Sequence, residues 1–254
     1  MNMRGAVATL LCVLATANAQ SLELRSATMA TATIELYTSE GCSSCPPADV
    51  WLSSLKYDPQ LFTRFIPMAF HVDYWNQLGW RDRFSAAAYS TRQRQMQAHA
   101  VLSQVYTPGF VVNNAEWRGW FKRGSKPSAA QLVNPNRDAG VLTALWESPD
   151  DFIAVDFKPQ VLADKSLWAN IAILGMGLTT QVQRGENSGR TLAHDFVVLS
   201  LERQPLAGDI SDSYSARFKP PSIPERGQQQ SVLVVWVSAG NSPAIVQAVA
   251  GILE

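Results

Sequence analysis

The sequence contains few cysteines and histidines, three of each among its 254 residues. A tetrahedral zinc site would need two more thiolates or histidines at motif spacing beside Cys42 and Cys45, and the only other cysteine lies near the N-terminus. Net charge is also lacking, because 21 lysines and arginines balance 21 aspartates and glutamates. No field of one sign therefore favours nucleic acid or a membrane surface as a partner. Beyond the N-terminus, no stretch reaches the ~18 apolar residues typical of a membrane span.

The first 19 residues are typical of a secretory signal peptide. Arg4 gives a positive start, residues 6–15 form a short apolar run, and residues 17–19 form a small-x-small cleavage site. We expect cleavage after Ala19, which removes Cys12 and leaves a periplasmic or secreted protein. Disulfides persist in such oxidising compartments. The two remaining cysteines therefore predict one functional pair rather than a disulfide scaffold.

Cys42 and Cys45 lie two residues apart, where a β-type stretch at 32–38 passes into a helical pattern at 50–55. This is where a thioredoxin-like domain places its redox pair. The free N–H groups and positive dipole end of the first helical turn stabilise a thiolate. We therefore expect Cys42 to ionise below the pKa of about 8.5 of a free cysteine. Cys42 is predicted to be the exposed attacking sulfur and Cys45 the resolving one.

The residues around the cysteines fit the first turn of a helix. Pro46 and Pro47 are tolerated there, because the N–H that proline lacks has no helical partner. Ser43 and Ser44 can cap free N–H groups and add little bulk over the sulfurs. The alternatives are a structural disulfide or half of a zinc site. A four-residue loop gives a disulfide only about 2 kcal/mol of chain entropy, against nearly 5 for a loop of about 100 residues, which favours redox or metal-handling use.

A second apolar run, at 65–72, predicts another buried strand. A strand–helix–strand order with a short crossover implies parallel pairing. Ligands gather at the carboxyl ends of such strands. We therefore expect a group of polar and aromatic residues to line the sheet edge that carries Cys42. The alternative is that these residues only form hydrogen bonds at the strand end and pack their rings. This group is His71, Asp73, Tyr74 and Trp75.

The rest of the first half predicts a helix at 84–105 and another at 128–146. Between them, Thr107 and Pro108 directly precede an apolar strand, the place where thioredoxin-like domains keep a cis-proline facing the cysteine pair. The alternative is an ordinary trans turn proline. The pair Asn113-Asn114 can adopt positive φ and turn a hairpin into a fourth strand at 115–119.

After residue 148 the pattern changes to short β-type runs bounded by Gly, Pro, Asn and Ser. These runs predict an all-β, sandwich-like C-terminal domain at 149–254, after an α/β thioredoxin-like domain at 30–148. The connection at residues 183–195 is unusually polar, and it is either a functional site of the second domain or a solvated loop. Its site candidates are Arg184, Glu186, Asn187, Arg190 and His194. The predicted strands are 152–157, 169–174, 178–183, 192–201, 214–218, 231–237 and 244–253.

With these residues in hand, the chain resembles the bacterial exported, thioredoxin-like family catalogued as domain of unknown function 1223 (DUF1223). The resemblance spans nearly the whole mature chain. It implies a thioredoxin-like N-terminal fold followed by a β-rich domain, and no particular substrate. The matching stretches are 35–49 (ELYTSEGCSSCPPAD), 70–75 (FHVDYW), 78–80 (LGW), 106–108 (YTP) with 111–113 (VVN), and 184–192 (RGENSGRTL).

Our leading hypothesis is a thiol–disulfide oxidoreductase that acts on protein thiols or disulfides, with a redox recycling partner and no cofactor. Glu35 is a candidate for proton transfer, and His71 and Asp73 are candidates for tuning the thiolate. The second hypothesis is Cu(I) binding, because soft thiolates of Cys42 and Cys45 with the imidazole of His71 or His194 suit that ion. The third is a binding module that keeps the fold without catalysis.

Overall fold

The computed structural model describes residues 21–122, 128, 131, 137–161, 166–208 and 212–253, so the predicted signal peptide lies outside the described part. The helices are α1 (Pro46–Ser54) and α2 (Ala87–Ala98), with short 3₁₀ helices η1 (Leu55–Tyr57) and η2 (Arg118–Phe121). The strands are β1 (Leu22–Arg25), β2 (Ala32–Thr38), β3 (Phe65–His71), β4 (Gly109–Val112), β5 (Ala115–Glu116), β6 (Gly140–Trp146), β7 (Ile153–Pro159), β8 (Leu167–Met176), β9 (Leu178–Gln181), β10 (Thr191–His194), β11 (Val197–Pro205), β12 (Ala207–Gly208), β13 (Tyr214–Phe218), β14 (Gln230–Ala239) and β15 (Ile245–Leu253).

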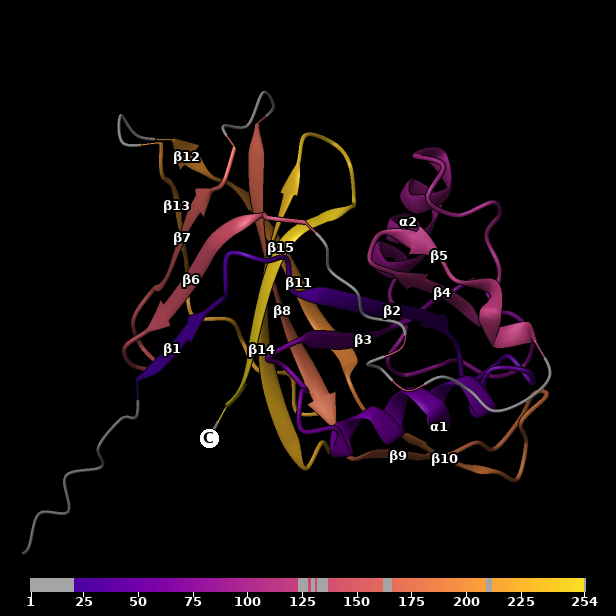
Figure 1. Ribbon diagram of the computed structural model, residues 1–254. Coiled ribbons are helices and arrows are strands. Elements are labelled where there is room, and N and C mark those ends of the chain that lie inside the picture. The colour runs from indigo at the N-terminus through magenta and orange to yellow at the C-terminus, as the bar shows by residue number, and fades with distance from the viewer. Residues whose placement is uncertain are drawn as a thin grey trace, which may run out of the picture.

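The fold is mixed α/β, and its largest unit is an eight-stranded sheet in the order β15-β14-β8-β11-β3-β2-β4-β5. This sheet is mixed, because β3 pairs in parallel with both β2 and β11 while the other neighbours pair antiparallel. A five-stranded antiparallel sheet, β1-β6-β7-β13-β12, lies against one end of it (Figure 1). The hairpin of β9 and β10 lies beside α1.

The strands β2 and β3 are buried along their whole length, as expected for apolar runs inside a sheet covered on both faces. Their parallel pairing confirms the prediction from the strand–helix–strand order. The helices α1 and α2 cover opposite faces of the sheet. Side chains of a strand alternate between the two faces, so the contacts of β2 show which helix lies on which face. Thr38 of β2 bonds Asp49 of α1, whereas Glu35, three positions earlier, bonds Arg92 of α2.

The five-stranded sheet and the other half of the large sheet enclose a second core. Leu142 and Phe157 come from the small sheet, and Ile171 comes from β8. Alternate residues of the same large-sheet strands, such as Leu174 and Val234, join the first core on the opposite face. β8 and β14 therefore separate two cores and contribute side chains to both.

Strands from the two sides of the predicted boundary at residue 149 share both sheets. β11 pairs with β3 through Val197 and Ala69, so the large sheet continues across the boundary. In the small sheet, β6 pairs with β7. The division into 30–148 and 149–254 stays a prediction, and the two segments are joined by continuous hydrogen bonding.

The helix predicted over 128–146 is wrong in its last part, because Gly140–Trp146 forms β6. Alternate residues of this strand are buried, which is the period of a strand and not of a helix. Leucine and alanine favour helices in isolation, but pairing with β1 and β7 overrides that preference. Most of residues 123–136 lie outside the described part.

Other predicted elements are confirmed in kind and corrected in extent. The helix predicted at 84–105 is the shorter α2, and the strand predicted at 192–201 divides into β10 and β11 at Phe196, whose φ is 61°. Positive φ at Asn113 and Asn114 confirms the predicted turn, and β15 confirms the last strand. None of the helices in the described residues is long and apolar enough to cross a membrane.

Candidate functional site

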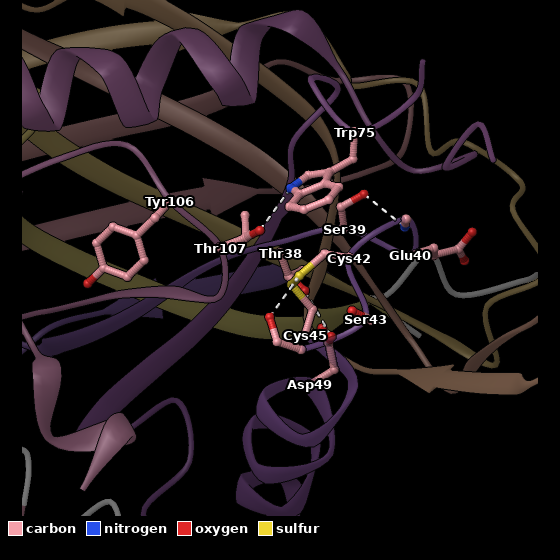
Figure 2. Close-up of a disulfide and its surroundings, with 12 residues drawn as sticks. Thr38, Ser39, Glu40, Cys42, Ser43, Cys45, Asp49, Trp75, Tyr106 and Thr107 are labelled. Carbon is pink, nitrogen blue, oxygen red and sulfur yellow. Dashed lines mark hydrogen bonds between the residues drawn. A yellow bond between two sulfur atoms is a disulfide. The ribbon is translucent and has the colours of Figure 1, made fainter. Parts of the chain in front are cut away.

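The loop that carries the two cysteines joins the end of β2 to the start of α1, as the sequence predicts. Cys45 is the N-cap residue of α1, and its carbonyl accepts hydrogen bonds from the N–H groups of Ala48 at 2.8 Å and Asp49 at 3.1 Å. Cys42 and Cys45 are joined in a disulfide, with their Cα atoms 5.5 Å apart (Figure 2). The pair therefore lies at the positive end of the helix dipole.

The prediction that Cys42 is exposed is wrong. Its exposed fraction is 1%, and that of Cys45 is 0%. Ser43 and Ser44, between them, are exposed. The indole of Trp75 lies on one side of the disulfide (Figure 2), and residues from the second half of the chain cover the loop from another direction. Small residues between the cysteines leave the sulfurs open only if no other segment packs over them.

The proline that follows α2 reaches the same end of β2 as the cysteines. β4 begins at Gly109 and pairs antiparallel with β2 at Tyr37, so the residues just before β4 continue toward the disulfide loop. The bond between Thr107 and Pro108 is cis, as predicted, and Pro108 is buried. The indole N–H of Trp75 donates to Thr107 Oγ1 at 2.9 Å (Figure 2), which holds these two segments together beside the disulfide.

The connection between β9 and β10 packs on the cysteine loop. The side-chain amide of Asn187 donates to the carbonyl oxygens of Glu40 at 2.9 Å and Cys42 at 3.0 Å, and Asn187 is 1% exposed. Arg190 Nη1 in turn donates to Asn187 Oδ1 at 2.9 Å. Asn187 lies 145 positions after Cys42, so the fold brings the polar connection predicted from the sequence into contact with the cysteine loop.

An acidic side chain of the same connection reaches the backbone between the cysteines. Glu186 Oε2 accepts a hydrogen bond from the N–H of Ser43 at 3.0 Å, and this contact lowers the pKa of the Glu186 carboxyl. Arg184, next to it, is exposed. Four of the five candidates from this region therefore lie at or near the cysteine loop: Glu186 and Asn187 contact it directly, Arg190 contacts it through Asn187, and His194 faces Glu40.

Glu35 lies on the opposite face of β2 from Thr38 and contacts α2. Its carboxylate accepts two hydrogen bonds from Arg92, at 2.8 and 3.0 Å, and one from the hydroxyl of Tyr37 at 3.0 Å. Burial, followed by the charge of Glu35, raises the pKa of Tyr37 well above its usual value. In this arrangement Glu35 is one half of a buried ion pair.

Two of the residues predicted to line the site contact α2. The Asp73 carboxylate accepts a hydrogen bond from the hydroxyl of Ser90. The Tyr74 hydroxyl donates to Gln93 at 3.1 Å, and burial raises the pKa of Tyr74 to about 12. These bonds fix the segment that carries Trp75 against α2, and so set the position of the indole beside the disulfide.

A cluster of buried ionisable side chains lies next to the cysteine loop. His71 Nδ1 is 2.7 Å from Asp82 Oδ2, and the same carboxylate oxygen accepts the backbone N–H of Glu40 at 2.9 Å. His194 lies between two further carboxylates, with Nδ1 3.7 Å from Asp49 Oδ1 and Nε2 3.5 Å from Glu40 Oε1. All five residues are at most 6% exposed.

The carboxylates and histidines of this cluster shift one another's pKa values. Burial alone disfavours the charged form of His194, but Asp49 and Glu40 outweigh it and raise the pKa of His194 to about 10. Burial likewise opposes ionisation of Asp82, yet His71 and two backbone N–H groups lower the pKa of Asp82. Both histidines were predicted as site candidates from the sequence, but the carboxylates of Glu40, Asp49 and Asp82 were not. Their positions in the sequence do not show that these side chains point into the core.

Asp49, His71 and His194 each offer a donor atom, and these atoms all lie within 4.8 Å of one another. Within the described residues this is the one group of three or more potential metal ligands, and it includes neither cysteine. The Cu(I) set predicted from the sequence, Cys42 and Cys45 with His71 or His194, stays a prediction, and both sulfurs are engaged in the disulfide in this structure.

The chain can now be compared with known proteins. A family model described as "Protein of unknown function (DUF1223)" matches residues 33–238. No curated protein matches the chain. Among solved structures, protein AGR_C_4864 from Agrobacterium tumefaciens is 22% identical with a TM-score of 0.55, over 89% of this chain and 96% of that one. HBP35 of Porphyromonas gingivalis is 16% identical with a TM-score of 0.55, over 90% and 76% of the two chains. Such identities show similarity of fold alone.

Proposed function

We propose that this chain, which belongs to the DUF1223 family, is an exported thiol–disulfide oxidoreductase acting on protein thiols or disulfides. The observation that carries the proposal is the disulfide between Cys42 and Cys45 at the start of α1. The N-terminal segment, with its two parallel strands, two covering helices and cis-proline, supports a thioredoxin-like domain. The following strands support a sandwich-like domain that completes the large sheet.

The proposed exchange has two steps. A substrate thiolate attacks the Cys42 sulfur, which breaks the Cys42–Cys45 bond and releases Cys45 as a thiolate that takes up a proton. A second substrate thiolate then attacks the substrate sulfur of the mixed disulfide and releases Cys42. Two electrons pass from the substrate dithiol to the cysteine pair, and a recycling partner removes them. The reverse sequence reduces a substrate disulfide, and the reduction potential sets the direction.

The surroundings assign different tasks to the neighbouring residues. The N-terminal end of α1 stabilises a thiolate at the pair. Pro108 and Thr107 present backbone on the edge where a substrate would lie. Because Cys42 is 1% exposed, exchange requires the β9–β10 connection or Trp75 to move away from the loop first. The pair is thus a guarded site, and its reactivity depends on that opening.

The test is redox titration of the mature protein in glutathione buffers, combined with trapping. We expect Cys45→Ser to accumulate a mixed disulfide with an unfolded protein that contains a disulfide, because the Cys42 thiolate attacks that disulfide, releases one of its sulfurs as a thiolate, and meets no second cysteine that resolves the new bond. The matched variant Cys42→Ser should accumulate far less, since Cys45 is the deeper sulfur. The burial of both sulfurs favours the competing possibility, a structural disulfide. A potential below about −300 mV without mixed disulfides in either variant would establish that possibility instead.

A further inference from the structure

We infer that Asp49, His71 and His194 form a binding site for a divalent transition-metal ion of the Zn²⁺ type. These residues come from α1, the end of β3 and the end of β10, so three segments distant in sequence meet at one buried point. The inference concerns side chains that the proposed exchange does not use. It holds or fails independently of the redox chemistry of the disulfide.

His71 is oriented as a metal ligand. Its Nδ1 lies 2.7 Å from Asp82 Oδ2, a distance at which an N–H at Nδ1 donates to the carboxylate. Nε2 then keeps its lone pair and has no hydrogen-bond partner, although the side chain is 0% exposed. Histidines that bind metals almost always donate their other N–H to a carboxylate, carbonyl or water in this way.

His194 lies between two carboxylates. Its Nε2 faces Glu40 Oε1 at 3.5 Å, and its Nδ1 faces Asp49 Oδ1 at 3.7 Å. The second oxygen of Glu40 accepts the indole N–H of Trp80 at 2.8 Å, which fixes the carboxylate in place. Metal binding displaces the proton on Nδ1, so that His194 keeps the Nε2 proton directed to Glu40 and binds the ion through Nδ1 on the side of Asp49.

The third ligand, Asp49, is also held from behind. Its Oδ2 accepts a hydrogen bond from the hydroxyl of Thr38 at 2.8 Å, which leaves Oδ1 directed toward His194. Each of the three ligands therefore has one partner outside the set and one free donor atom. Two imidazoles and a carboxylate are the ligands of many three-residue zinc sites, which leave the fourth position for water.

A cation at this point shortens the contacts of buried polar atoms that make no hydrogen bond. Glu40 Oε1, His71 Nε2 and both ring nitrogens of His194 are buried without a hydrogen bond. An unsatisfied buried polar group costs about 1 to 3 kcal/mol, and here four of them meet. A bound ion takes one nitrogen from each histidine and fixes the remaining His194 proton toward Glu40, which gives all four atoms a partner.

Distance and charge favour a transition metal. Nitrogen and oxygen donors about 2.0 to 2.2 Å from zinc stand roughly 3.3 Å apart in a tetrahedron, so the three donors, now within 4.8 Å of one another, need to close by up to about 1.5 Å. Rotation of buried rings over that distance is a modest adjustment. The carboxylates of Asp49, Asp82 and Glu40 supply negative charge for a dication. Imidazole nitrogens favour zinc and its neighbours over calcium or magnesium.

The experiment uses the mature chain with its disulfide intact, so that neither cysteine offers a thiolate. After removal of metal with a chelator, the protein is titrated with Zn²⁺ by calorimetry and with Co²⁺ by visible absorption. We expect one equivalent of each to bind, and the Co²⁺ complex to show ligand-field bands without a thiolate charge-transfer band. Metal binding should also raise the unfolding temperature.

The variants decide which residues bind. His194→Gln should abolish stoichiometric binding, and Asp82→Asn should weaken it about 10- to 100-fold by removing the support of His71. His99→Gln is the matched control, because His99 is exposed and belongs to no such cluster. If His194→Gln does not fold, Asp49→Asn replaces it with the same expectation. Lack of a one-to-one complex in the unmodified protein, or unchanged binding in the ligand variant, would overturn the inference.

Discussion

Replacement of Asn187 by alanine tests whether the β9–β10 connection guards the disulfide. The substitution removes three hydrogen bonds: two to the carbonyls of Glu40 and Cys42, and one from Arg190, whose exposed guanidinium can bond water instead. The Cys42 carbonyl keeps a second donor, the N–H of Cys45 at 3.2 Å, so its loss should amount to about 1 kcal/mol. For the buried Glu40 carbonyl, loss of the Asn187 donor should cost about 1 to 3 kcal/mol.

The two contributions together lower the stability of the docked connection by about 2 to 4 kcal/mol. If reduction proceeds through transient opening of this connection, the population of the open form rises by the corresponding factor. Since about 1.4 kcal/mol is tenfold, even 2 kcal/mol predicts a roughly 30-fold faster reduction of the disulfide. The assay is the rate of reduction by a small dithiol under native conditions, followed by thiol release, together with the free energy of unfolding.

Ser188→Ala is the matched control, because Ser188 lies in the same connection and its hydroxyl bonds only the Gln183 carbonyl at an exposed position. We expect its reduction rate to change less than about threefold, in keeping with a surface substitution worth under about 0.5 kcal/mol. An Asn187→Ala protein that is destabilised but reduced no faster would refute the guarding role and leave Asn187 as a purely structural residue. A protein changed in neither property would contradict the hydrogen bonds themselves.

Two further predictions concern a buried ion pair and acid pH. Arg92→Leu leaves the Glu35 carboxylate buried and unpaired, so denaturant titration should show a loss of about 3 to 5 kcal/mol, against under about 0.5 for the exposed Arg94→Leu; similar losses would contradict the pairing. The Glu186–Ser43 contact lowers the pKa of Glu186 below its ordinary 4.5, so it is fully formed above that pH and lost as pH falls through the lowered pKa. Reduction by a phosphine should therefore accelerate in acid relative to Glu186→Gln, and parallel pH profiles would exclude this contribution.

Features that depend on neighbouring residues could be predicted from the sequence. The passage from strand to helix placed Cys42 and Cys45 correctly, and a short crossover implied the parallel pair of β2 and β3. The Thr107–Pro108 dipeptide before an apolar strand indicated the cis bond. The Asn113-Asn114 pair indicated the turn. In each of these, local backbone chemistry decides the outcome.

Features that depend on distant segments could not be predicted in the same way. The burial of Cys42 follows from docking of Asn187, 145 positions further along the chain. The side of β2 on which Glu35 lies follows from alternation, but its partner Arg92 is 57 positions away. The helical preference of residues 140–146 is overridden by two neighbouring strands. In all three, tertiary packing prevails over a pattern that is locally ambiguous.

The β9–β10 region contacts the cysteine-bearing segment at two separate levels, which decides how the site can open. At its tip, Asn187 holds the backbone of the cysteine loop. At its base, Asp195 pairs with Lys56 of η1 at 2.8 Å, directly after His194 enters the buried cluster. The four residue pairs of β9 and β10 lie between these levels, so the tip and the base are held by separate contacts. Loss of the contacts at the tip therefore leaves the contacts of His194 with Glu40 and Asp49 in place. The disulfide can become exposed while the proposed metal site stays buried.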